Sequence, residues 1–139
     1  ESKELEKCGF SAWIKIVKDY DRNRDLILKL PRERGVYAIR ADKLIPRIKG
    51  ESDIIYIGEG NIQSRIQLLF LKVVFAINFR NYWSKHTARE GFERILKEAR
   101  LNLEFSFKEG NAAKEIEGKL IERYCKDHIE PPPLNNTRK

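Results

Sequence analysis

Methionine is absent from this chain of 139 residues, and cysteine occurs only as Cys8 and Cys125. Two cysteines are too few for a disulfide framework or a closed four-ligand zinc site, which excludes the small disulfide-rich and zinc-finger classes. They fit a reducing compartment, so we expect a cytoplasmic protein. Cys125 and His128 have the spacing of one helix face, but no further cysteine–histidine cluster supports a metal site on this pair. Without methionine, the sequence leaves open whether the chain is one domain of a longer protein.

Long apolar runs are also missing. The longest, residues 68–77, is interrupted by Lys72 and is shorter than the roughly 20 residues that cross a bilayer. The N-terminal residues lack the pattern of a signal peptide. We therefore expect no membrane partner and interpret the run as a buried helix.

Basic residues are the group in excess. Twenty-eight lysines and arginines against 21 acidic residues give a formal charge of +7 and a pI near 9.5. This charge favours a polyanionic partner, most plainly nucleic acid. The alternative is an ordinary solvated surface, because charged residues make up 35% of the chain and both signs are interspersed. With 41% hydrophobic residues, the length fits one compact globular domain.

Hydrophobic periodicity predicts an α+β fold with three strands. The first segment is expected to be a helical extension over residues 1–31, broken only near Asp21, and a second unit to follow over 32–139. The expected strands are 36–39, 54–57 and 103–108, the later helices are 62–77, 87–100 and 112–127, a loop spans 41–53, and a turn spans 58–61. Asn61 is the expected N-cap of the helix that starts at residue 62.

Polar side chains with a shared chemistry lie on these elements. Tyr37 and Tyr56 end up near each other if the first two strands pair as antiparallel neighbours. Arg65 lies at the edge of the apolar stripe of the next helix. Glu117 falls in the middle of the apolar arc of the last helix, where a carboxylate is costly unless it meets a cation. That cation is either a divalent metal or a structural partner such as Arg65 or a lysine, and the wheel alone leaves both open.

Taken in order, these residues resemble the GIY-YIG nuclease superfamily. The resemblance rests on Gly35-Val36-Tyr37, on Tyr56-Ile57-Gly58, on Arg65, on Glu117 and on Asn135 after the prolines. It covers roughly residues 35–136. It implies a small three-stranded antiparallel sheet flanked by helices in the order β-β-α-α-β-α, which agrees with the elements expected from periodicity.

The resemblance also implies a metal-dependent endonuclease acting on DNA through a single Mg²⁺ or Mn²⁺. Glu117 would hold the metal, Arg65 would clamp the scissile phosphate, and Tyr37 would act as the general base. Tyr56 would orient the water or a phosphate oxygen. Asn135 would position the metal shell or hold the tail over the site.

Two departures from the family pattern concern the substrate path. Glu59 follows the second motif where family members often have a basic or small residue, and an acid there would oppose phosphate unless it points outward. Leu69 occupies the position of an auxiliary base in some members, so Lys72 and His86 are secondary candidates for that role. Gly58 and Asn61 are secondary candidates for substrate contact.

Two other classes of function remain open. One is a catalytically inactive nucleic-acid-binding module of the same fold, against which the presence of all five site residues argues. The other is a small basic domain that binds RNA or a protein. The N-terminal segment carries no zinc finger or helix-turn-helix, so no target sequence is predicted.

Overall fold

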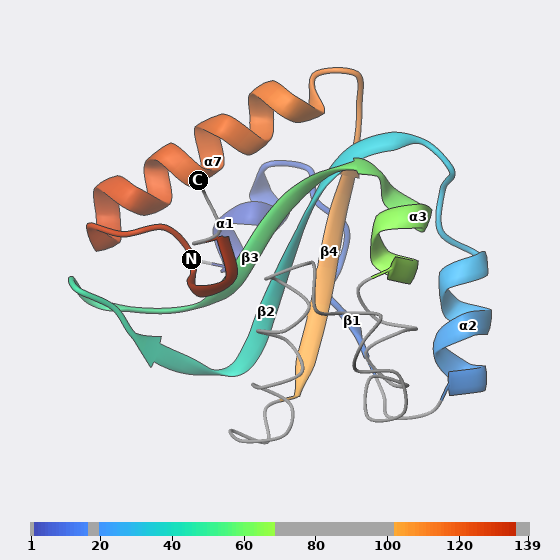
Figure 1. Cartoon of the computed structure of the whole chain (residues 1–139), viewed down its shortest axis with the longest axis horizontal. Helices are drawn as coiled ribbons and strands as arrows, with labels where there is room; N and C mark the ends of the chain where they lie inside the picture. Colours follow the sequence, from blue (N-terminus) through green and yellow to red (C-terminus); the bar gives the residue numbers. More distant parts are fainter. Residues whose placement is uncertain (1, 17–19, 69–101, 136–139) are drawn as a thin grey trace, which may run out of the picture.

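The computed structural model describes residues 2–16, 20–68 and 102–135. Over these ranges the chain is an α+β protein with a four-stranded antiparallel sheet flanked by helices (Figure 1). The strand order is β1-β4-β2-β3, with β1 at Ile14–Lys15, β2 at Arg34–Pro46, β3 at Glu51–Asn61 and β4 at Leu103–Glu109. The helices are α1 (Ser2–Lys7), α2 (Tyr20–Leu28), α3 (Ile62–Ile66) and α7 (Ala113–His128), followed by the 3-10 turn η3 (Pro133–Asn135).

Strand β2 is central and is covered on both faces. Its residues 36–39 are all buried because successive side chains point to opposite sides of the sheet and both sides are packed. Tyr37 and Ile39 join a cluster with residues of α2 and α3, whereas Val36 and Ala38 join a second cluster with residues of α1 and α7. The helices in Figure 1 therefore form two layers, one on each face of the sheet.

The prediction that the N-terminal segment is one nearly continuous helical extension is wrong. The segment forms two short helices separated by β1, which pairs with β4 through Ile14↔Phe105 and becomes the fourth strand of the sheet. Helix α1 ends at Lys7. Gly9, two residues later, has a φ of 93° in the left-handed region that favours glycine, and the amide of Phe10 bonds back to Leu5. The spacing of the apolar residues after Gly9 suits both a helix and an extended segment. The glycine interrupts the helix, and the residues after it are extended.

The first two strands are longer than the sequence indicated. Residues 41–53, expected as a loop, are mostly strand, and residues 42–53 form a two-stranded extension that we call the hairpin arm. It is held by the pairs Ile45↔Ser52 and Pro46↔Glu51, while the ladder between β2 and β4 reaches only to Ala41↔Leu103. The expected turn at 58–61 is likewise wrong, because these residues continue β3.

Asn61 caps α3 as predicted. Its side-chain oxygen accepts a hydrogen bond of 3.0 Å from the amide of Ser64, and α3 begins at Ile62. The expected helix 87–100, the second half of the expected helix 62–77, Lys72 and His86 lie outside the described residues. Among the described helices, none has the length and apolar character needed to cross a membrane.

Candidate active site at the edge strand

The two tyrosines of the motifs lie side by side on one face of the sheet. Tyr37 pairs with Gly58 across the β2–β3 ladder, which confirms antiparallel pairing and puts Tyr56 diagonally opposite Tyr37. Their ring centroids are 6.0 Å apart with the planes tilted by 37°. Their hydroxyl groups share a hydrogen bond. The two phenols are therefore a coupled pair.

Glycines in β3 make room for this pair and for Arg65. A Cβ atom at Gly58 would lie 2.5 Å from the hydroxyl oxygen of Tyr37 and 2.9 Å from the ring of Tyr56. A Cβ atom at Gly60 would lie 2.7 Å from Nε of Arg65, and Gly60 has a φ of 138° that other residues rarely adopt. Gly58, expected as a substrate contact, thus serves first to admit the tyrosines. Gly60 was missed at the sequence level, although a second glycine two residues after the motif was a visible signal.

Arg65 brings positive charge to the phenols. It lies in the last turn of α3, its side chain is exposed, and it passes over Gly60. Its charge acts on both Tyr37 and Tyr56, lowering the pKa that each phenol would otherwise have. A guanidinium that is exposed and close to two hydroxyls is suited to bind an anion such as a phosphate.

Glu117 approaches the same phenols from the other layer. It lies in α7 among Ile116, Leu120 and Ile121, which pack against the sheet, and it is half-buried, unlike the exposed Glu115 and Glu122. Its charge acts on Tyr37 and on Tyr56 and raises the pKa of both. The prediction that this carboxylate interrupts the apolar arc is therefore confirmed by its burial.

The donor atoms at this place are all oxygen. A carboxylate and two phenols are the hard ligands that Mg²⁺ accepts, and Mg²⁺ needs few protein ligands because it keeps most of its water. Within the described residues there is no group of three or more His, Cys, Asp and Glu side chains that could hold a metal ion. A metal at Glu117 would therefore depend on one carboxylate and on water, and the chemistry of the donors fits that arrangement.

Asn135 holds the strand that carries Tyr56. Its amide oxygen accepts from the backbone amide of Ile57 at 2.9 Å, and its amide nitrogen donates to the carbonyl of Ile57 at 2.7 Å. β3 is the last strand in the sheet, so these bonds satisfy groups that no neighbouring strand pairs within the described sheet. Of the two roles expected for Asn135, holding the tail at the site is the one that these contacts support.

Burial sets the ionisation of the two tyrosines. It raises the pKa of Tyr37 well above its usual range and raises that of Tyr56 as well. The shared hydrogen bond raises the pKa of Tyr37 and lowers that of Tyr56, as expected when the hydroxyl of Tyr37 donates to the oxygen of Tyr56. Tyr37 is only 3% exposed, whereas Tyr56 is half-buried. Both phenols keep their protons at neutral pH, and Tyr56 is the more accessible one.

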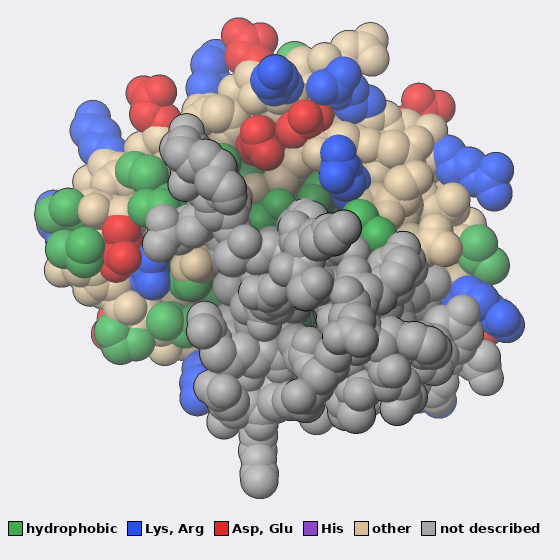
Figure 2. All heavy atoms as spheres, in the orientation of Figure 1, with side chains coloured by type: hydrophobic (Ala, Val, Ile, Leu, Met, Phe, Trp, Pro, Cys, Tyr) green, Lys and Arg blue, Asp and Glu red, His purple; other side chains and the backbone are tan. Residues whose placement is uncertain are grey.

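The acid that departs from the family pattern is neutralised. Both Nε and Nη2 of Arg34 donate to one carboxylate oxygen of Glu59, at 3.2 and 3.1 Å. Acidic and basic side chains are likewise interspersed along the rim over α7 in the view of Figure 2. The charge near the site is therefore mixed, and Arg65 is the basic side chain closest to the phenols in the contacts described above.

The remaining candidate residues either lie away from the two tyrosines or make other contacts. The side chain of Asn61 is used by the cap of α3. His128, considered with Cys125 as a metal pair, packs against Tyr124 and has Nδ1 2.8 Å from the carbonyl oxygen of Lys49. A pocket of about 340 Å³, lined in part by Arg40 and Glu104, borders none of the five main candidates.

The charges of Arg65 and Glu117 thus both act on the two phenols, and Asn135 holds the strand that carries Tyr56. Comparison with protein-family models, with curated proteins and with solved structures found no match to this chain.

Proposed function

We propose that this protein is a metal-dependent endonuclease of the GIY-YIG type that hydrolyses phosphodiester bonds in DNA. The observation that carries the proposal is that the charges of Arg65 and Glu117 both act on the neighbouring phenols of Tyr37 and Tyr56, although the four residues come from β2, β3, α3 and α7. Residues so far apart in sequence and so similar in chemistry to a phosphodiesterase site argue for a shared task. The three-stranded core of the GIY-YIG fold is part of the same proposal, with β1 as an addition.

The residues divide the reaction between them. Arg65 binds the scissile phosphate through its planar fork and offsets the negative charge that grows in the transition state. Tyr56, the more accessible phenol, would orient the attacking water and, once its own proton has been released to solvent, accept a proton from that water as the water oxygen bonds to phosphorus. The phosphorus bond to the leaving oxygen breaks, and that oxygen takes a proton from solvent. Tyr37 donates to Tyr56 and stabilises its ionised form, so the general-base role expected for Tyr37 passes to Tyr56, and Tyr37 supports it.

Glu117 is the residue that would hold the metal. Mg²⁺, when bound, would supply positive charge at this site. Such charge would oppose the effect of burial, which raises the pKa of Tyr56. Asn135 contributes by fixing the backbone next to Tyr56.

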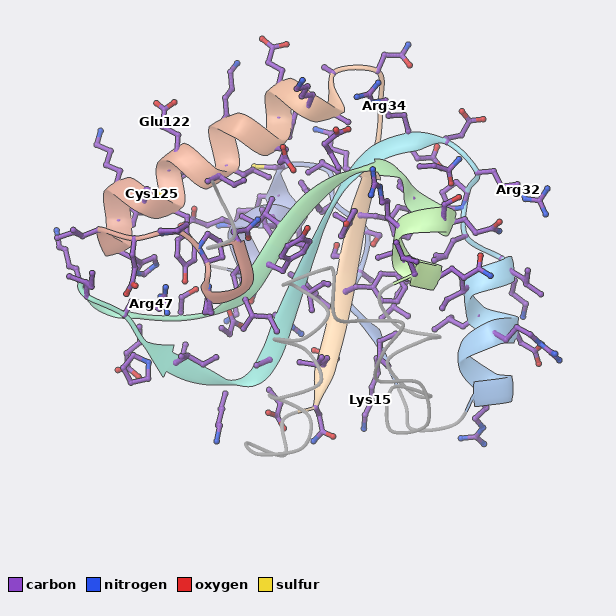
Figure 3. All side chains as sticks on the ribbon, viewed as in Figure 1. Lys15, Arg32, Arg34, Arg47, Glu122 and Cys125 are labelled. Atoms are coloured by element: carbon purple, nitrogen blue, oxygen red, sulfur yellow. The ribbon has the colours of Figure 1, made fainter. Side chains whose placement is uncertain are left out.

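The test compares two glutamates of α7. We expect the protein to nick supercoiled plasmid or cleave branched DNA with Mg²⁺ and not with EDTA. Glu117→Gln should abolish cleavage and leave DNA affinity nearly intact, because it removes the charge that holds the metal and leaves Arg65 in place. Glu122→Gln is the matched control, since Glu122 lies on the exposed side of α7 and points away from the sheet in Figure 3.

Melting temperature separates this proposal from a structural role for Glu117. If Glu117 serves chiefly as an ion-pair partner, the variant should lose several kcal/mol of stability, roughly 3–5. A large fall in melting temperature with cleavage retained per folded molecule would remove Glu117 from the mechanism. Failure of the wild-type protein to cleave any of these substrates, with DNA still bound, would favour the inactive binding module.

A further inference from the structure

The seven residues after α7, 129–135, form a strap across the outer edge of β3. At its far end, Asn135 bonds to both the amide and the carbonyl of Ile57. These groups belong to the two peptide units that link Tyr56 to Gly58. The position of the strap is therefore coupled directly to the backbone on the carboxyl side of Tyr56.

The near end of the strap is fixed to the tip of the hairpin arm. Nη2 of Arg47 donates to the carbonyl of Pro131 at 2.7 Å and lies 3.0 Å from the carboxylate of Glu130. The amide of Ile48 donates to the same carboxylate at 2.6 Å. Figure 3 labels Arg47 where the arm and the end of α7 come together. Arg47 is thus the side chain of the arm that bonds to the strap at two residues, beside the backbone contacts of Ile48 with Glu130 and of Lys49 with His128.

The strap is stiff between its two attachments. Three consecutive prolines, 131–133, restrict the backbone, and Pro132 is buried. The amide of Asn135 bonds to the carbonyl of Pro132, which closes the final turn. A shift at the arm is therefore carried along the strap to Asn135 rather than absorbed between the two ends.

The buried ion pair of Arg47 is not expected to contribute much net stability to the fold. The side chain is only 11% exposed, and its buried Nε has no hydrogen-bond partner among the described residues. Ile129, at the start of the strap, has a φ of 64°, which is unusual for a β-branched residue. Buried ion pairs often contribute little net stability and instead select one arrangement. Here the arrangement selected is the path of the strap.

We propose that Arg47 is a positioning residue for Tyr56, acting through the strap and Asn135. The part concerning Tyr56 rests on the proposed nuclease function, whereas the coupling of Arg47 to Ile57 does not. Arg47 touches none of the four clustered residues in the contacts described above. Its loss should change the geometry of the site and leave the groups that bind phosphate unchanged.

Hydrogen exchange provides a readout independent of activity. Two amides are held in the same way: that of Ile57 by Asn135 at 2.9 Å and that of Ser64 by Asn61 at 3.0 Å. In Arg47→Met we expect exchange at Ile57 to rise roughly tenfold, because release of the strap removes its bond, while exchange at Ser64 stays the same. Arg123→Met is the matched control, since its ion pair with Glu4 joins α7 to α1 away from the strap.

A double-mutant comparison tests whether Arg47 acts through Asn135. Asn135→Ala should raise exchange at Ile57 by itself, and adding Arg47→Met should then change nothing further. Unchanged exchange at Ile57 in the single Arg47 variant would overturn the proposal. So would an additive effect in the double variant, or a rise at Ser64 equal to that at Ile57, which signals general destabilisation.

Kinetics tests the link to Tyr56. We expect Arg47→Met to lower kcat roughly tenfold or more with KM nearly unchanged, because misplacing a reacting group affects the chemical step more than binding. If Arg47→Met raises exchange at Ile57 but turns over DNA at the wild-type rate per folded molecule, this link is overturned. If the wild-type protein cleaves no DNA, the proposed function fails, and the exchange comparison still decides whether Arg47 holds the strap.

Discussion

At the scale of single residues, the two tyrosines are chemically unequal although they come from matching motifs. Tyr37 is buried on the central strand, where desolvation favours the neutral phenol. Tyr56 is on the outer strand and is less covered. The position of each tyrosine in the sheet, rather than its residue type, therefore makes the hydroxyl of Tyr56 accessible and leaves Tyr37 as its buried hydrogen-bond partner.

The raised pKa of Tyr37 predicts a stability change in alkali. The neutral form is favoured in the folded protein, so the corresponding stability is present below about pH 10, where the unfolded phenol titrates, and is lost as the pH rises through the folded pKa. Between these values the unfolded chain has already released the proton. Urea denaturation from neutral pH to above pH 10 should show a steeper loss for the wild type than for Tyr37→Phe.

The same variant has a second effect at neutral pH. Loss of the hydroxyl removes the hydrogen bond to Tyr56 and should cost about 1 kcal/mol of unfolding free energy. Equal losses of stability in alkali for both proteins would contradict the assignment of the shift to Tyr37. Tyrosinate absorbance of the folded protein, followed over the same range, gives an independent measurement.

At the scale of elements, glycines have opposite consequences in β3 and in α7. Gly58 faces Tyr37 and Tyr56 so closely that a methyl group has no room, whereas nothing lies within 4 Å of a Cβ atom at Gly118. Gly118 is exposed and lies in the interior of α7, where glycine weakens a helix. The strand needs its glycine for packing, and the described part of the structure gives the helix no such need.

Replacing each glycine by alanine should therefore change stability in opposite directions. Gly118→Ala should stabilise the protein by roughly 0.5–1 kcal/mol through helix propensity. Gly58→Ala should destabilise it by about 1–3 kcal/mol, because Tyr37 and Tyr56 must move. Thermal or urea denaturation of both variants measures this. Destabilisation by Gly118→Ala would mean that a neighbour approaches α7 at this residue.

The elements that the sequence predicted best were those with strong local signals. Alternation of apolar residues predicted the third expected strand, now β4, and Asn61 marked the start of α3. The error in the N-terminal segment came from β1, whose two residues are strand only because β4 lies beside them. The length of the hairpin arm was not predicted for a similar reason. Polar residues at its tip are held in place by contacts with the end of α7, which lies far away in the sequence.

The candidate site was predictable as a set of residues and not as a set of roles. Motif order indicated Tyr37, Tyr56, Arg65 and Glu117 together, and the structure brings their charges within reach of one another. Which phenol is buried, and what Asn135 bonds to, depend on strand order. Strand order is a long-range property that spacing along the chain does not contain.

At the scale of the whole molecule, the described Lys and Arg side chains on the face seen in Figure 2 are interspersed with Asp and Glu side chains. Ion pairs such as that of Arg34 with Glu59 neutralise part of the positive charge. Affinity for a polyanion should therefore depend on a limited number of contacts, of which Arg65 is the best placed.

DNA binding should accordingly weaken as salt rises, with a slope set by the number of phosphate contacts. Each phosphate contact contributes a log–log slope of about −0.9 in duplex DNA, because counterions are released on binding. Arg65→Ala should make the slope shallower by about one contact, whereas Arg123→Ala should leave it unchanged. Fluorescence anisotropy over a salt series measures both slopes. Binding that is indifferent to salt would point to a protein partner instead.

The bond between Asn135 and Ile57 also sets an order of events when the chain folds. Strands β2 and β3 are joined by a tight turn, so their hairpin can form locally and early, on a scale of microseconds. β1 pairs with β4, which lies about 90 residues later in the chain, and Asn135 lies 78 residues after Ile57. Contacts between distant parts of a sequence form slowly because a long loop must close first. During synthesis, Tyr37 and Tyr56 can therefore come together while Asn135 is still inside the ribosome. The bonds of Asn135 to Ile57 form only when the end of the strap emerges.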